Sequence, residues 1–513
     1  MDTSEQAGAG GCQLPDTLES SSALARLPDE VLLLVMQYLD VEDLFRCRLV
    51  CKRLAGLALD PDAWQHRNLS DEHPWACAVL RLAPCLKSLV MLAPSTMACH
   101  MLALSRTKCA AAKLLFSLQS GYGVTQMEEV IRHQEALGRL KGLHVSITPI
   151  MDGATATKLL DVVTSIPALE ELSLYILTLS IPLTARPALR SVSGPSLKNF
   201  VLEWEAGHGT GLPQPIEDVS RFLLAEHAAT LERIEFESNA GVIKPPASLL
   251  ASMPNLRVLN CSPFPGMRAL AASESLRDLC LVVKPATVTT DTREFLRGAG
   301  NLRVIDMTFS SIGENCTWTP TTAGVDLVED LASTVEELSI SNEAEATARC
   351  LPQVQPLLRA LPTLTCLRNL FLEVAPDELL AAITPTTAPA LQWLSVTNSD
   401  WGCTHAWLHR GVVKKLLSEN PSLHVQVRAD EASAPCRENP CETCEYDCHM
   451  DLCEFESILF THDPHDSCAV KVHASIFCYY ISDVSTIESD TVNAELGWSD
   501  LDMVQGAQAN MFE

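Results

Sequence analysis

Residues 27–64, LPDEVLLLVMQYLDVEDLFRCRLVCKRLAGLALDPDAW, decide the fold at the beginning of this chain. Pro28 suits the first turn of a helix, where a missing N–H group costs nothing. The apolar run from Val31 to Leu39 surrounds the axis of this helix instead of forming one stripe. One face can pack within the unit, so the other face needs a partner.

Two further short helices are expected within the same stretch. Asp40 suits a helix N-cap, with Asp43 at the capping-box distance, and predicts the start of a second helix. The apolar residues of 49–57 predict a third helix, and a last turn ends at Trp64. A unit of roughly 40 residues buries too little surface to be stable alone. Its remaining apolar surface therefore predicts a protein partner.

The order of the motifs in this stretch resembles an F-box: Leu27-Pro28-Asp29-Glu30, then Tyr38-Leu39-Asp40, Asp43-Leu44, Val50-Cys51-Lys52-Arg53-Leu54 and Trp64. The resemblance implies docking on the Skp-type adaptor of a cullin-RING ubiquitin ligase. The alternative is an ordinary helical hairpin that caps a repeat domain, which needs only one apolar face. The adaptor-binding residues expected from the F-box are Leu27, Pro28, Val31, Leu34, Val35, Tyr38, Leu39, Leu44, Val50, Cys51, Leu54 and Trp64.

Length and charge limit the classes of partner. With 513 residues the chain is expected to hold more than one unit, and no apolar run approaches the ~20 residues of a membrane span. A net charge of −27 argues against nucleic-acid and anionic-membrane surfaces and favours basic partners. Residues 1–22 are small, polar and acidic, which indicates a disordered leader. The 20 cysteines are expected as reduced thiols in the cytoplasm, the nucleus or both.

After an F-box at residues 23–69, residues 70–429 carry a repeat with apolar side chains at positions 0, 3 and 5. Several units have a proline two residues before the first apolar position, where it stops a helix. Clear units begin at Leu140, Leu169, Leu197, Leu231, Leu256, Leu276, Leu302, Val335, Leu367 and Leu391; looser ones begin at Leu86 and Ala111, and a closing strand is expected at Leu423–Val427.

The spacing of these units leaves room for one strand and one helix in each, which resembles leucine-rich repeats. The Asn or Cys usual at position 8 of that family is found only at Asn239 among these units. The fold class expected is an α/β solenoid: a three-helix F-box, an irregular leucine-rich-repeat horseshoe and an acidic, cysteine-rich tail.

Alternate strand positions are expected to face a bound partner. Acidic and aromatic residues recur there, which suggests a carboxylate-lined groove for a basic substrate segment; the alternative is a solvated acidic face that maintains solubility. The expected substrate-binding residues are Tyr175, Glu203, Glu235, Glu237, Asp278, Asp306, Glu337, Phe371 and Trp393.

The tail, residues 430–513, carries 18 acidic residues against two basic ones, or −16 of the total charge, and seven cysteines. Zinc binding by Cys441, Cys444, Cys448, His449 and Cys453 is one interpretation, because zinc takes four sulfur or nitrogen ligands. An iron–sulfur cluster or a tail of reduced thiols are the alternatives. The residues 458–460 are β-like and are expected to pack.

Enzymatic motifs such as a nucleophile elbow or a phosphate-binding glycine loop are not found in the sequence. We therefore expect no enzyme and no cofactor apart from the zinc alternative. The function expected is the substrate-recognition subunit of an SCF-type E3 ubiquitin ligase, which presents a protein substrate on the concave repeat face. The alternatives are a scaffold without a role in ubiquitylation, or a metal-responsive receptor gated by the cysteine-rich tail.

Overall fold

The fold is given by a computed structural model of the whole chain. It describes residues 27–92, 104, 106–116, 123–148, 151, 153–177, 189, 194–205, 212–238, 243–284, 287–309, 324–342, 351, 353–398, 407, 410–420, 422–429 and 458–461. The chain forms two compact units, Met1–Leu302 and Arg303–Glu513.

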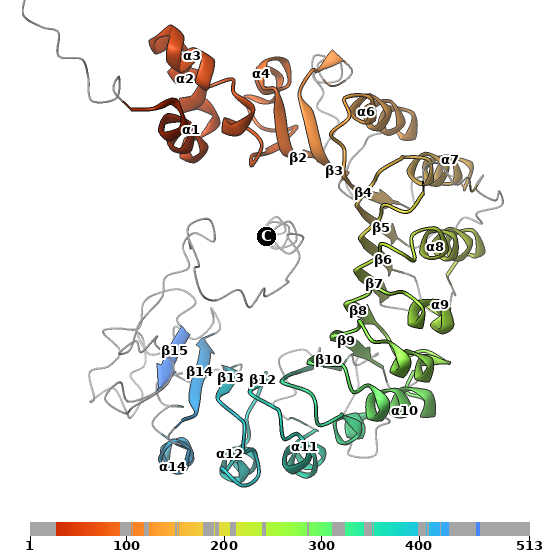
Figure 1. The fold of residues 1–513 in the computed structure, drawn as a ribbon, viewed down its shortest axis with the longest axis vertical. Coiled ribbons are helices and arrows are strands. Elements are labelled where there is room, and N and C mark those ends of the chain that lie inside the picture. Colours follow the sequence, from red (N-terminus) through yellow and green to blue (C-terminus); the bar gives the residue numbers. More distant parts are fainter. Residues whose placement is uncertain are drawn as a thin grey trace, which may run out of the picture. The chain divides into compact units, whose positions relative to one another are not determined.

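The first unit begins with short helices and the first strand of a sheet (Figure 1). These elements are α1 (Asp29–Tyr38), α2 (Val41–Val50), α3 (Lys52–Leu57), the 3-10 helix η2 (Pro61–Ala63), β1 (Asn68–Ser70) and α4 (Ala76–Leu82). Two extended residues, Leu39 and Asp40, separate α1 from α2, and one, Cys51, separates α2 from α3, so the chain turns sharply between the helices.

A parallel sheet follows in the same unit, with each strand paired to the next strand of the chain. Its strands are β2 (Cys85–Met91), β3 (Ala110–Phe116), β4 (Gly142–Ile147), β5 (Glu171–Leu177), β6 (Asn199–Glu205), β7 (Arg233–Ser238), β8 (Val258–Cys261) and β9 (Asp278–Val283). The helices between them are α6 (Val124–Ala136), α7 (Gly153–Thr164), α8 (Gln214–Glu226), α9 (Ala247–Ala251) and η3 (Met267–Ala272), and α10 (Thr290–Gly298) follows β9. Within this unit α6 to α9 lie on one side of the sheet (Figure 1).

The second unit repeats this arrangement. Its strands are β10 (Val304–Phe309), β11 (Glu337–Asn342), β12 (Asn369–Leu372), β13 (Trp393–Asn398), β14 (His424–Ala429) and β15 (Ile458–Thr461). Its helices are η4 (Val325–Asp330), α11 (Val354–Ala360), η5 (Leu361–Thr363), α12 (Asp377–Ala382) and α14 (Gly411–Glu419). Strands β10 to β14 pair in parallel, whereas β15 pairs antiparallel to β14.

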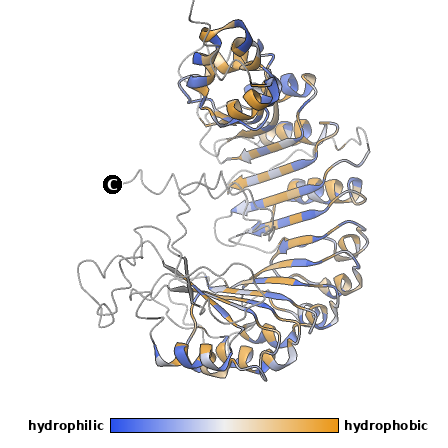
Figure 2. Cartoon of the chain, turned by 60° about the vertical axis from the view of Figure 1, so that its left-hand side comes forward, coloured by the Kyte–Doolittle hydropathy of each residue, from blue (hydrophilic) through white to orange (hydrophobic). Residues whose placement is uncertain are grey.

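The predicted alternation of the strands is confirmed by burial. In β5, β6 and β9 every second residue is buried and the residues between them are partly exposed. Figure 2 shows apolar and polar residues following one another along several strands of the sheet. Equivalent positions of neighbouring repeats are in register, since Leu172 pairs with Phe200 and Phe200 pairs with Ile234. The buried side chains pack between the sheet and its helices, where Phe200 and Phe236 meet edge to face at 6.1 Å. The result is a solenoid-like repeat of strand and helix.

Two strands need comment. β1 was not expected; it begins at Asn68 and pairs with β2, so the sheet starts before the expected boundary at residue 70. β15 contains residues 458–460, which were expected to be β-like and to pack; the structure pairs them with β14, a partner that the sequence did not predict. No helix among the described residues is long and apolar enough to cross a membrane.

Candidate functional site

The outer face of α1 is an apolar surface with no partner among the described residues. Val31, Leu34, Val35 and Tyr38 are 38, 56, 48 and 73% exposed. They are spaced i, i+3, i+4 and i+7, which places them on one side of the helix. We call these four side chains the α1 stripe. Single exposed apolar residues are common on proteins, but a contiguous stripe is typical of an interaction site.

The opposite face of α1 belongs to a small core. Leu32 and Met36 are buried there, and Trp64 is fully buried. The indole N–H of Trp64 donates to the carbonyl of Ala58 at 2.8 Å, and its ring centroid lies 5.8 Å from that of Phe45. This core holds α1 in place and leaves the α1 stripe outside.

The structure separates the predicted adaptor-binding residues by exposure. Leu44 and Trp64 have no exposed surface, so they are core residues of the helical unit and do not present a surface to a partner. The exposed members are Pro28, Val31, Leu34, Val35, Tyr38, Val50 and Cys51, and the half-buried members are Leu27, Leu39 and Leu54. Leu49 was missed: it is 87% exposed in the last turn of α2, not in a third helix as expected.

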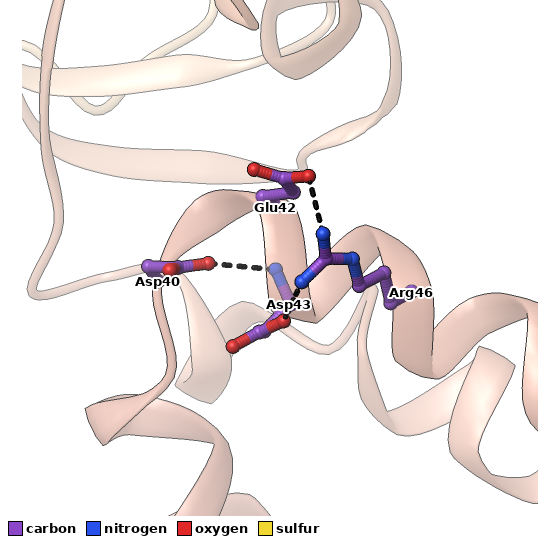
Figure 3. A network of polar contacts seen from close by, with 4 residues as sticks. All are labelled: Asp40, Glu42, Asp43 and Arg46. Atoms are coloured by element: carbon purple, nitrogen blue, oxygen red, sulfur yellow. Dashed lines mark hydrogen bonds and ion pairs between the residues drawn. The ribbon is translucent and has the colours of Figure 1, made fainter.

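The start of α2 is fixed by a polar network (Figure 3). Asp40 accepts a hydrogen bond from the backbone N–H of Asp43 at 2.7 Å, which is the expected N-cap. Arg46 donates to Glu42 at 2.7 Å and to Asp43 at 2.8 Å along the same helix. The cap stabilises the first turn of α2, in which Leu44 is buried, whereas Leu49 and Val50 in the last turn are exposed.

Replacing Asp40 with Ala removes this cap. We expect the free energy of unfolding to fall by about 1 kcal/mol, because one of the free N–H groups at the helix start loses its acceptor. Urea unfolding followed by circular dichroism measures the change. Asp40→Ser keeps an acceptor and should have little effect; equal losses for Ala and Ser would show that the cap does not stabilise α2.

A second candidate surface lies on the sheet of the first unit. Tyr175, Glu203 and Glu237 are neighbours in one row across β5, β6 and β7. The Tyr175 hydroxyl donates to Glu205 at 2.6 Å, and the Asn260 amide donates to Glu237 at 2.7 Å. Burial and the two nearby carboxylates raise the pKa of Tyr175, so it remains a neutral donor. Glu205 was missed because it lies at position 8, beyond the outward strand positions considered, and Asn260 was missed because it is neither acidic nor aromatic.

Glu235 and Asp278 are adjacent to this row. Glu235 is largely buried and pairs with Arg233 two residues earlier on β7, with an N–O distance of 3.1 Å. Asp278 lies in the row of Arg233, with Val258 between them. These five predicted residues therefore share one face of one unit.

The remaining predicted substrate residues belong to the second unit. Asp306 is mostly buried, and this burial raises the pKa of its carboxyl group. Glu337 accepts from the amide of Asn369 at 3.1 Å, and the Trp393 indole donates to Gln426 at 3.1 Å. Phe371 lies half-buried on the same face. The predicted substrate-binding residues thus form one group in the first unit and another in the second.

His144 on β4 makes the first unit sensitive to pH. Its Nδ1 atom is enclosed without a hydrogen-bond partner among the described residues, and burial lowers the pKa of His144 from 6.5 to about 4. The folded state therefore binds fewer protons than the unfolded state below the unfolded pKa. The contribution of neutral His144 to the free energy of unfolding is therefore fully present above pH 6.5 and is lost as the pH falls towards 4.

We expect protonation of His144 alone to lower the free energy of unfolding by about 2 kcal/mol between pH 7.5 and pH 5. This value follows because one pH unit between the two pKa values corresponds to about 1.36 kcal/mol. His227 contributes in the same direction, since burial lowers its pKa and its Nδ1 accepts from the backbone N–H of Ser196 at 3.1 Å. Chemical unfolding across this pH range measures the slope. His144→Gln should flatten it; an unchanged slope would contradict the assignment.

The predicted zinc ligands Cys441, Cys444, Cys448, His449 and Cys453 lie outside the described residues. Within the part of the chain that the structure describes, no group of three or more His, Cys, Asp and Glu side chains could hold a metal ion. Zinc in the tail therefore stays a prediction, and elemental analysis of the purified full chain tests it.

Comparison with known proteins identifies the helical unit. Residues 24–70 match the F-box-like family. No curated protein matches the chain. A crystal structure of the Rad7 and Elc1 complex in yeast is similar at 14% identity, covering 77% of this chain and 86% of that chain, with a TM-score of 0.32. A likeness at that TM-score supports no inference about this chain.

Proposed function

We propose that this chain, which carries an F-box-like domain at residues 24–70, is the substrate-recognition subunit of an SCF-type E3 ubiquitin ligase. The observation that carries the proposal is the exposed α1 stripe within that domain. A helix that presents residues i, i+3, i+4 and i+7 fits a hydrophobic groove on a partner. The partner proposed is the Skp-type adaptor, which connects the chain to a cullin-RING ligase.

Leu49 and Val50 extend the proposed contact beyond α1. They are 87 and 69% exposed at the end of α2, next to the exposed Cys51. Single apolar side chains are tolerated on a protein surface. Together, however, Leu49, Val50 and the α1 stripe form an apolar surface whose burial against a partner is energetically favourable. Adaptor binding by the intact chain, compared with a variant altered in the α1 stripe, tests the proposal.

The strand–helix units are proposed to be irregular leucine-rich repeats. The buried residues at positions 0, 3 and 5 and the parallel register support this assignment. A solenoid exposes a row of strands on one side, which provides an extended surface for a protein segment. We propose that this surface holds the substrate.

The substrate proposed for the first unit contains a basic segment. Glu203 and Glu237 are partly exposed in the row of Tyr175, and Glu235, although largely buried, lies on the same face. Carboxylates and an aromatic ring together suit the cationic groups of Lys and Arg.

Changing Glu203, Glu235 and Glu237 to Lys should reduce the recovery of basic partner proteins at least tenfold in affinity purification, because like charges then repel. Quantitative mass spectrometry measures partners and adaptor in the same sample. Glu128 and Glu129 on α6 and Glu294 on α10, changed to Lys, alter the net charge by the same amount and are the matched control. Unchanged recovery of basic partners would contradict the proposed binding of a basic segment and would support the alternative, a solvated acidic face that maintains solubility.

The chain itself is proposed to contribute no catalytic group. It would raise the effective concentration of a substrate near the subunits that carry ubiquitin, in the cytoplasm or the nucleus. Loss of the chain should then lengthen the half-life of its partners. A scaffold without a role in ubiquitylation would bind the adaptor but leave every partner's half-life unchanged.

A further inference from the structure

Arg67 joins the F-box-like helices to the sheet. α1 has acidic residues in its first turn and no basic residue in its last turn. The guanidinium of Arg67 supplies that charge from outside the helix: Nη2 donates to the carbonyls of Met36 at 2.6 Å and Gln37 at 3.2 Å. Nε donates to the carbonyl of Ala63 at 2.7 Å. A cation at a helix C-terminus satisfies free carbonyls and interacts favourably with the helix dipole.

The backbone of the same residue belongs to the sheet. The carbonyl of Arg67 accepts from the N–H groups of Lys87 at 2.9 Å and Ser88 at 3.3 Å, in β2. The next residue, Asn68, begins β1, and its side chain accepts from the Ser88 hydroxyl at 2.7 Å. The side chain of Arg67 therefore caps α1 while its main chain is fixed in the sheet.

The contacts require arginine in particular. The guanidinium lies 5.7 Å from the Trp64 ring centroid and directs its planar donors to carbonyls on two different elements. Burial lowers the pKa of Arg67, but an arginine remains charged at neutral pH. A lysine would keep the charge without the planar arrangement of donors.

We propose that Arg67 is a positioning residue that holds the F-box-like helices in one orientation on the repeat sheet. The consequence for ubiquitin transfer rests on the proposed function: with the adaptor bound, a fixed orientation sets where the sheet and its substrate stand relative to the ligase. A joint that rotates freely would spread the substrate over a larger volume and lower its effective concentration. The orientation itself can be measured without the adaptor.

The test is single-molecule fluorescence transfer in the full chain, with dyes on non-natural amino acids at Gly56 and Glu129. Gly56 has open space around its Cβ position, and Glu129 is exposed on α6. We expect one narrow distribution for the natural sequence and a distribution at least twice as wide for Arg67→Met. Arg67→Lys should lie between them.

Arg53→Met is the matched control. Arg53 also makes hydrogen bonds between elements, to the Asp29 carboxylate and the Leu27 carbonyl, but its own main chain lies in α3, whereas the main chain of Arg67 is hydrogen-bonded to β2. We expect its distribution to match that of the natural sequence. A narrow distribution for folded Arg67→Met would overturn the proposal; if that variant does not fold, Arg67→Lys is judged by the same criterion.

Adaptor binding is measured separately on the same proteins. If the adaptor does not bind the natural chain, the proposed ligase function fails while the role of Arg67 in orientation stands on the fluorescence result. If the adaptor binds and the distribution of Arg67→Met stays narrow, the role of Arg67 in orientation fails while the proposed ligase function stands.

Discussion

Replacing Leu34 and Tyr38 with Asp should weaken binding of the Skp-type adaptor at least 100-fold, equivalent to about 2.7 kcal/mol. Leu34 lies in the middle of the α1 stripe and Tyr38 at its end, and they are 56 and 73% exposed. Binding would force two new carboxylates out of water into an apolar contact, which is costly without a partner charge. Because neither residue belongs to the core, the thermal unfolding midpoint should change little. Calorimetry with the purified adaptor measures the affinity.

Leu82→Asp is the control for this variant. Leu82 is 42% exposed on α4, outside residues 24–70. The substitution therefore places a carboxylate at an exposed apolar position away from the F-box-like domain. We expect it to bind the adaptor normally. Adaptor binding by the Leu34/Tyr38 variant within threefold of the natural chain would refute the α1 stripe as the docking surface.

The regular parts of the fold could be predicted because period and capping are local signals. Alternation at positions 0, 3 and 5 predicted buried strand residues such as Leu172 and Leu202, and both are buried. Asp40 predicted the start of α2 because an N-cap involves residues three apart. β1 was missed because Asn68–Ser70 is too short to show a period.

Contacts between distant residues could not be predicted. Leu44 and Leu49 carry the same side chain on one helix, yet one is buried and the other is 87% exposed, since exposure depends on how α1 and α3 pack around α2. Arg67 reaches carbonyls about thirty residues earlier in the chain, and its sequence neighbours give no sign of this. The bond between Tyr175 and Glu205 depends in the same way on the pairing of two strands.

Trp64→Ala should have the largest effect on stability, a loss of about 3–5 kcal/mol in the free energy of unfolding of the F-box-like domain. Trp64 is fully buried between Phe45 and Arg67, and its removal leaves a cavity that such a small core cannot fill. It also leaves the Ala58 carbonyl without its donor. Hydrogen exchange measured by mass spectrometry over residues 27–70 would show the loss, while the sheet from β4 onward should keep its protection.

This substitution also distinguishes a core residue from a docking residue. Trp64 is buried, so it can affect adaptor binding only by unfolding the helices that carry the α1 stripe. Trp64→Ala should therefore weaken the adaptor complex more on warming, as the unfolded fraction grows, whereas the Leu34/Tyr38 variant should fail to bind at every temperature. Trp64→Phe retains most of the ring and should recover part of the stability and the binding together. Normal exchange protection in Trp64→Ala with lost binding would instead place Trp64 at the adaptor contact.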